Sequence, residues 1–135
     1  MSAMSDYLEG QLIAHIFRTG SFTKPTVLAV GLFTAAPTDA GGGTEVTGGS
    51  YARATLNPLD ANWAAPSAGN GVTSNSSAIT FATPSASWGV VTHFGIFDAA
   101  SAGNLLFWGA LTASQTISSG NTVSFPAGSL TITLA

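Results

Sequence analysis

The strongest constraint on the fold is that, from about residue 25 onward, turn residues interrupt the chain every few positions. Between the turns, short segments alternate apolar with small or polar residues at a period of two, as in PTVLAVGLFTA, residues 25–35. This period is typical of β-strands that bury one face. Clusters such as AGGGT, residues 40–44, interrupt regular structure and mark turns. Many short strands joined by turns favour an antiparallel β protein.

We therefore expect a mainly β chain: an antiparallel β-sandwich or jelly roll of about seven or eight strands with one N-terminal α-helix. Residues 88–98 and 104–111 flank the turn AASAG and predict a long hairpin, whereas residues 57–77 are mostly loop. The other expected strands cover residues 25–35, 50–56, 78–82, 115–118, 122–125 and 129–134. The aromatic residues expected to fill much of the core are Trp88, Phe94, Phe97, Phe107 and Trp108.

The N-terminal segment has helical rather than β periodicity. Asp6 with Glu9 three positions later resembles a capping box. Arg18 followed by Gly20 is typical of a helix end. We predict a helix over residues 6–19. The apolar residues on one face of this helix are Leu8, Leu12, Ile13, Ile16 and Phe17.

This helix has two interpretations. Its apolar face covers one open end of the sandwich, or the segment is an arm that docks on a neighbouring subunit. The length of 135 residues fits one domain, in which residues 1–20 form the helix or arm and residues 21–135 form the β-sandwich. Trp63 is expected to anchor the long loop. The candidate interface residues are Tyr7, Leu8, Leu12, Phe17 and Trp63.

Charge is scarce. Charged residues make up 7% of the chain, against an ordinary share of about 25%. The three cations are Arg18, Lys24 and Arg53, too few and too scattered to neutralise a phosphate backbone, so we expect no nucleic-acid partner. Protein interfaces are depleted of charge at their centres. The composition therefore favours a surface that neighbouring protein covers or that is meant to be inert.

His93 and Asp98 lie five positions apart in the expected hairpin and invite comparison with a catalytic pair. On a regular strand, side chains alternate between faces, so these two point in opposite directions. Trp88, Phe94 and Ile96 share one face of this strand, and Val91 and Phe97 share the other. A general base needs its orienting carboxylate within hydrogen-bond reach. We expect Asp98 to bond the backbone amides of the following turn and His93 to be a half-buried or interface residue.

Other catalytic and metal-binding patterns are weak. His15 and His93, without any cysteine, make a poor transition-metal set. Asp39 and Glu45 flank the glycine-rich loop, but a calcium loop concentrates more oxygen ligands than these two. The remaining acids are dispersed, whereas glycosidases need two carboxylates about 5 to 10 Å apart. We expect no catalytic residue, no cofactor and no metal, and we expect that the protein is not an enzyme.

The sequence also bears on location. No run approaches the roughly 18 apolar residues of a membrane span, so no membrane association is expected. The segment MSAMSDYLEG is acidic and does not resemble a signal peptide. We expect the protein to be made in the cytoplasm.

Three segments of the chain carry a resemblance to a known protein family. They are VGLFTAAPTDAGGGTEVTGGSYARATL, WGVVTHFGIFDAASAGNLLFWGALT and FPAGSLTITL. In combination they resemble a family of small structural proteins encoded by tailed bacteriophages, and the resemblance runs from about residue 7 to the C-terminus. It implies a virion component. It carries over no catalytic or binding residue.

Two virion roles follow from this resemblance. The first is a capsid cement, or decoration, protein that binds the outer surface of the major capsid protein shell and stabilises it. Its partners would be the major capsid protein and copies of itself, as a dimer or trimer, and it would be made in the host cytoplasm. The second is a tail fibre or receptor-binding module, in which exposed aromatic residues such as Tyr51 and Trp63 stack on a host sugar. We favour the capsid because the chain lacks the elongated repeats of a fibre.

Overall fold

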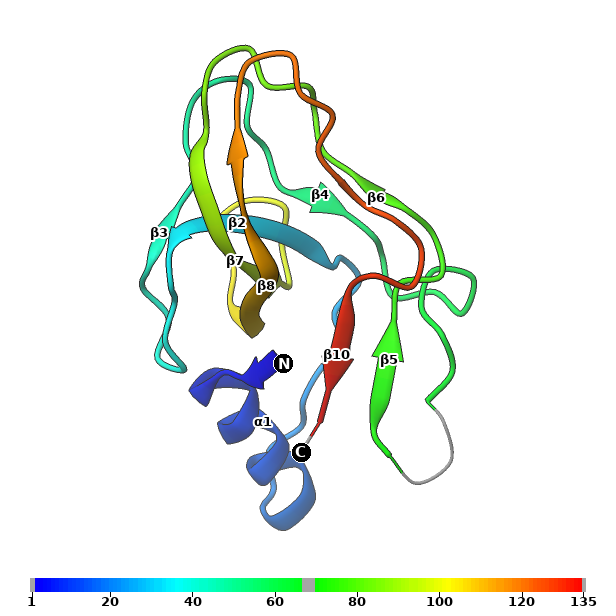
Figure 1. Ribbon diagram of the computed structural model, residues 1–135. Coiled ribbons are helices and arrows are strands. Elements are labelled where there is room, and N and C mark those ends of the chain that lie inside the picture. Colours follow the sequence, from blue (N-terminus) through cyan, green and yellow to red (C-terminus); the bar gives the residue numbers. More distant parts are fainter. Residues whose placement is uncertain (1, 67–69, 135) are drawn as a thin grey trace.

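The expected hairpin forms the centre of the fold. In the computed structural model, which describes residues 2–66 and 70–134, β7 (Gly89–Phe97) and β8 (Leu105–Ile117) pair antiparallel (Figure 1). The other edge of β7 pairs with β2 (Ala29–Ala35). Three shorter strands complete this large sheet: β1 (Ser2–Met4) on β8, and β3 (Thr44–Glu45) and β4 (Ala54–Thr55) on β2.

Two small antiparallel sheets face the large one. The first joins β5 (Val72–Ser74) to β10 (Thr131–Thr133), and the second joins β6 (Ile79–Thr80) to β9 (Ser124–Phe125). The expectation of a mainly β, sandwich-like fold with one helix is confirmed. Ten strands form in the described part of the chain, and the sheets stay open rather than closing into a barrel.

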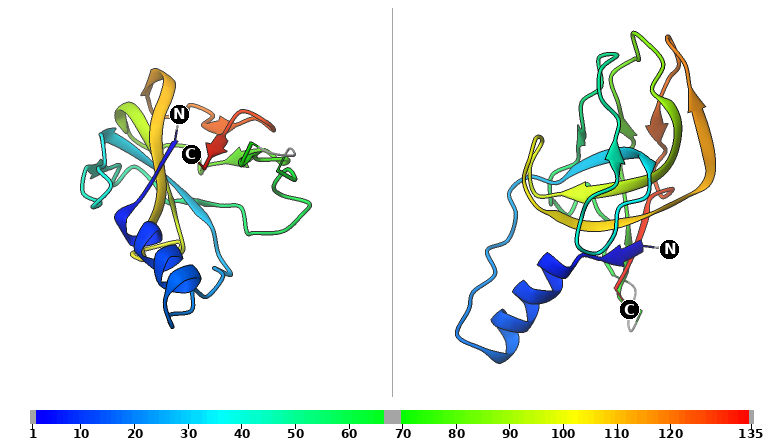
Figure 2. Two further views of the ribbon diagram at one scale, coloured as in Figure 1. Left: turned by 90° about the horizontal axis from the view of Figure 1, so that it is seen from below. Right: turned by 90° about the vertical axis from the view of Figure 1, so that its left-hand side faces the viewer.

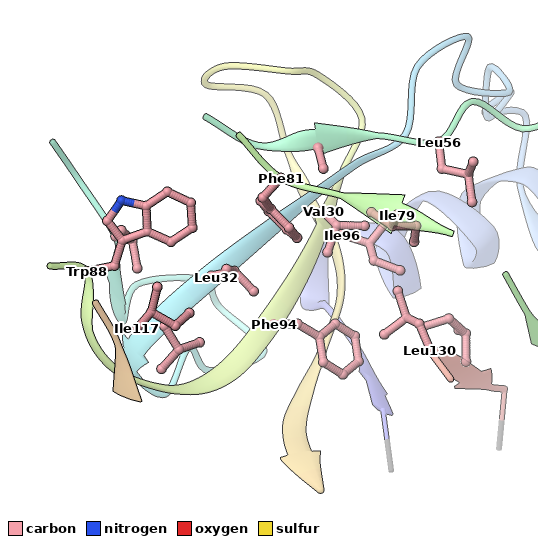
Figure 3. Packing of buried hydrophobic residues seen from close by; sticks show 14 residues of the cluster. Val30, Leu32, Leu56, Ile79, Phe81, Trp88, Phe94, Ile96, Ile117 and Leu130 are labelled. Atoms are coloured by element: carbon pink, nitrogen blue, oxygen red, sulfur yellow. The ribbon is translucent and has the colours of Figure 1, made fainter. Parts of the chain in front are cut away.

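The core lies between the large sheet and the small ones (Figure 3). Trp88 and Phe94 belong to it, as expected, while Phe107 is only partly buried against it. Two expected core residues lie elsewhere. Phe97 is buried on the opposite face of β7, beside Phe33, and Trp108 is half-buried, where its indole N–H donates to Asp39 Oδ1 at 2.9 Å. The core residues drawn and labelled in Figure 3 include Val30, Leu32, Leu56, Ile79, Phe81, Trp88, Phe94, Ile96, Ile117 and Leu130.

The simple alternation expected along residues 88–98 is wrong at one point. Val91 lies in the core together with Phe94 and Ile96, although an unbroken strand would place it on the other face. The pairing with β8 shifts register between Val91 and His93. Between these two pairs β7 advances by two residues and β8 by five, from Gln115 to Ala110, so the regular alternation breaks here and Val91 faces the core.

Several strand boundaries also differ from the sequence prediction. Residues 115–118 do not form a separate strand, because β8 continues through Ile117. The expected strand at 50–56 shrinks to β4, because Gly49 and Ser50 have positive φ angles and form a turn. The expected loop 57–77 contains β5, and its residues 67–69 lie outside the described residues. β1 was not predicted, because three residues carry no readable period.

Helix α1 spans Asp6–Phe17, two residues shorter than expected. Its N-cap is Ser5, not the expected Asp6: the Ser5 hydroxyl accepts from the Leu8 N–H at 3.2 Å. At the other end the Arg18 N–H donates to the Ala14 carbonyl at 3.2 Å, and the backbone of Arg18 is extended. Figure 2 shows that the helix extends away from the sandwich.

Candidate functional site

The base of α1 is fixed to the large sheet. β1 pairs with β8, with Ala3 opposite Trp108. The Ser5 hydroxyl donates to the Leu105 carbonyl, and the Ser5 N–H donates to the Leu106 carbonyl at 2.9 Å. These bonds join the residues immediately before the helix to β8, and they set the direction in which α1 leaves the sheet.

Beyond its first turn, α1 presents an apolar face to solvent. Leu8 is buried within the chain's own fold, and Leu12 is half-buried. The exposed fractions of the other large apolar side chains rise along the helix: Tyr7 38%, Ile13 55%, Ile16 65% and Phe17 79%. Of the four helix residues expected at an interface, Tyr7 and Phe17 are thus available for contact. Ile13 and Ile16 were not named as interface residues, although their helical spacing with Phe17 carries the signal.

Trp63, the fifth candidate interface residue, lies in an apolar groove at one end of the sandwich. The groove has a volume of about 650 Å³ and runs between the large sheet and the β5–β10 pair. The Trp63 indole N–H donates to the Leu56 carbonyl at 3.0 Å, so the ring is an anchor in the groove wall. Other lining residues are Leu28, Phe107 and Ile132, with the exposed Leu59 and Leu134 and the charged Lys24 and Asp60.

His93 and Asp98 are each held by other groups. The Asp98 carboxylate accepts from the Asn104 backbone N–H at 2.6 Å and from Asn104 Nδ2 at 2.8 Å, which confirms that it caps its turn. His93 is half-buried; its Nδ1 lies 2.8 Å from Thr92 Oγ1, and its ring lies 6.2 Å from that of Trp108. The geometry does not make them a catalytic pair.

A cluster of side chains covers the face of the large sheet opposite the core. We call Phe33, Glu45, Arg53 and Phe97 the outer cluster. Arg53 Nε donates to Glu45 Oε1 and Arg53 Nη2 to Glu45 Oε2, both at 2.8 Å. The guanidinium carbon lies 3.4 Å from the centroid of the Phe97 ring, which stacks on Phe33 with centroids 6.2 Å apart. A bidentate ion pair over an aromatic ring is among the stronger polar arrangements a sheet surface can carry.

A cross-strand pair of glycines makes room for the outer cluster. Gly31 on β2 lies opposite Gly95 on β7. A Cβ at Gly31 would lie 2.7 Å from Glu45 Oε1, and a Cβ at Gly95 would lie 2.9 Å from the Phe33 ring. Larger residues at either position would push the cluster off the sheet.

Arg53 also holds the turn between β7 and β8. Its Nη1 donates to the carbonyls of Ala102, at 2.7 Å, and Ala99, at 3.2 Å. The outer cluster therefore brings together four segments that carry much of the family resemblance. They are VGLF, TEV, SYAR and FDAASAG. Their characteristic residues stabilise the fold.

Tyr51 joins the outer cluster to the core. Its hydroxyl donates to Glu45 Oε1 at 2.8 Å and accepts from the Leu32 N–H at 2.9 Å, while its ring packs edge-on against Trp88 at 5.2 Å. Burial removes water from the phenol and raises the pKa of Tyr51 above its ordinary value, and the adjacent Glu45 carboxylate adds to this. Tyr51 is therefore not the exposed platform for a sugar that the sequence suggested.

The acidic side chains near the glycine-rich loop bond to groups within the chain. Asp39 accepts from Trp108, and Glu45 is engaged by Arg53 and Tyr51. Within residues 2–66 and 70–134, no three His, Asp or Glu side chains gather as a metal-binding group. In the same ranges, no helix is long and apolar enough to span a membrane.

The fold and these surfaces define a small, open β-sandwich protein with a projecting N-terminal helix. The chain belongs to the family described as podophage GP4 fiber I protein gp80, whose family model matches residues 3–133. No curated protein matches the chain. The membership makes the chain a phage virion structural protein and confirms the resemblance at that level. The description names a fibre, the second of the two roles considered from the sequence.

Proposed function

We propose that the protein is a structural component of a podophage fibre and works by fitting against neighbouring virion proteins. The observation that carries the proposal is the family match over residues 3–133, nearly the whole chain, to a protein described as a fibre component. The match covers the helix, the sandwich and the groove together. The match therefore extends over all of these parts of the chain and is not limited to one segment.

The chemistry of the described residues supports a role in contact. Several polar side chains form hydrogen bonds within the chain. They are those of Asp98, Glu45, Arg53 and Tyr51. The exposed large apolar side chains gather mainly on α1 and at the groove, where water is a poor partner. Exposed apolar patches of this kind mark surfaces that other proteins cover.

Capsid cement is the second candidate, and the single sandwich of the described residues supports it. Residues 2–66 and 70–134 form one sandwich and show no elongated repeat of the kind that builds a fibre shaft. In that role the partner would be the major capsid protein and the location would be the outer capsid surface. The fibre role requires other fibre or tail proteins as partners.

Location and copy number in purified virions separate the two roles. Immunogold labelling with antibodies against this chain should mark the tail end of the particle. Quantitative mass spectrometry should give a copy number far below that of the major capsid protein. Label distributed over the whole capsid, with a copy number close to that of the major capsid protein, would contradict the fibre role and support cement.

A further inference from the structure

Exposed large apolar side chains of the described residues occur almost entirely at two separate places. Four lie on α1, two lie at the apolar groove, and the seventh, Val90, lies apart from both. The members are Tyr7, Ile13, Ile16 and Phe17 on the helix, and Leu59 and Leu134 at the groove. The two surfaces share no residue.

We propose that the helix face of one copy binds in the apolar groove of a second copy. Ile13, Ile16 and Phe17 have the i, i+3, i+4 spacing with which an amphipathic helix places anchors in an apolar groove. The groove, at about 650 Å³, offers Trp63 and the aliphatic side chains around it as the complementary surface. This contact deepens the proposed fibre role by naming a partner, and its biological meaning rests on that role.

The charges beside the two surfaces are complementary. Glu9 lies on the same side of α1 as Ile13 and Ile16, and Arg18 follows the end of the helix. Lys24 and Asp60 line the groove. Only nine residues of the chain are charged. Three of them belong to the helix surface, the acids Asp6 and Glu9 and the cation Arg18, and two belong to the groove. Glu9 of one copy can meet Lys24 of the next, and Arg18 can meet Asp60, which fixes the direction of the helix in the groove.

The contact is directional because each copy uses its helix on one side and its groove on the other. The bonds of Ser5 and β1 hold the start of α1, and the apolar half of the helix extends away from the sandwich (Figure 2). A head-to-tail contact of this type closes into a ring or continues as a filament. Either product places copies side by side, as a fibre or its attachment requires.

The test measures the mass of the purified full chain by light scattering and sedimentation velocity over a range of concentrations. Wild-type protein should associate. Ile16→Glu, which alters the helix, and Leu59→Glu, which alters the groove, should each raise the dissociation constant by roughly tenfold or more. Val90→Glu is the matched control, because it places the same charge on an exposed apolar position away from both surfaces, and it should associate like the wild type.

A mixture of the two variants gives the sharpest result. The Ile16→Glu copy keeps its groove and the Leu59→Glu copy keeps its helix, so one intact contact remains between them. At a concentration where each variant alone is a single copy, the mixture should form a one-to-one dimer and stop there. A charge exchange, Glu9→Lys with Lys24→Glu, should likewise restore the association that each change alone weakens.

Three results would overturn the inference. Wild-type protein that remains a single copy at every concentration contradicts it. So does an Ile16→Glu chain that associates like the wild type while circular dichroism shows it to be folded. A mixture of the two variants that stays as single copies contradicts the head-to-tail arrangement. These outcomes concern the chain in solution, whereas the location of the protein in the virion tests the fibre role separately.

Discussion

Replacing Arg53 by methionine should destabilise the fold strongly, because Arg53 connects three segments that are distant in sequence. Its side chain is 10% exposed and makes two hydrogen bonds to Glu45, whose side chain is 24% exposed. It makes two more to the carbonyls of Ala99 and Ala102. Methionine keeps an apolar stem but removes the guanidinium that lies over Phe97. It leaves Glu45 with the Tyr51 hydroxyl as a donor and takes the Arg53 donor from both carbonyls.

The magnitude follows from the burial. Removing one partner of a buried ion pair costs about 3–5 kcal/mol. Glu45 keeps some access to water, so we expect a loss of about 2–4 kcal/mol in the free energy of unfolding for Arg53→Met. The assay is equilibrium unfolding in urea, followed by tryptophan fluorescence, with the slope of the transition compared between variants.

The control is Arg18→Met, measured at a protein concentration low enough for a single copy. Arg18 is exposed, and its replacement should change the free energy of unfolding by less than about 0.5 kcal/mol. In a double-mutant cycle, Glu45→Gln should cost much less in the Arg53→Met background than in the wild type. Equal effects of Arg53→Met and Arg18→Met would refute the assignment of the outer cluster as a main stabilising feature.

Three further stability predictions use the same unfolding assay. Gly95→Ala should lower the free energy of unfolding by about 1–3 kcal/mol, because its Cβ would lie 2.9 Å from two side chains. Gly10→Ala has nothing within 4 Å of its Cβ and should raise the free energy of unfolding by about 0.5–1 kcal/mol. The reverse order of the two variants would contradict the packing. Because the pKa of Tyr51 is raised by folding, the unfolded chain loses that proton first, so stability should fall above about pH 10. Tyr51→Phe should flatten this fall and Tyr7→Phe should not; identical pH profiles would count against the burial of Tyr51. Ser5→Ala should cost about 0.5–2 kcal/mol through loss of the N-cap, and an unchanged free energy of unfolding would show that Ser5 does not hold the helix.

Local sequence patterns predict the elements whose stabilising contacts lie close together in the chain. The helix and the β7–β8 hairpin each carry a clear period and turn residues, and Asp98 could be assigned to its turn because its partner lies six residues away. The alternation failed at Val91, where the register shift depends on the pairing with β8.

Contacts between distant segments could not be predicted in this way. The segment SYAR is visible in the sequence, but nothing local shows that Arg53 reaches Glu45 and the turn at Ala99 and Ala102. Trp63 was expected to be an anchor, yet the groove around it requires β10, about 70 residues further along the chain. The apolar face of α1 was visible from its spacing, whereas its exposure follows from where β1 and Ser5 fix its base.

A density map of the intact virion tests the central claim most directly, because it shows where this fold lies and what covers it. The account predicts the sandwich within a fibre at the tail, with the helix face carrying Ile16 and Phe17 in contact with protein. Density for the fold spread over the capsid surface, or within a fibre but with that helix face open to solvent, would contradict it.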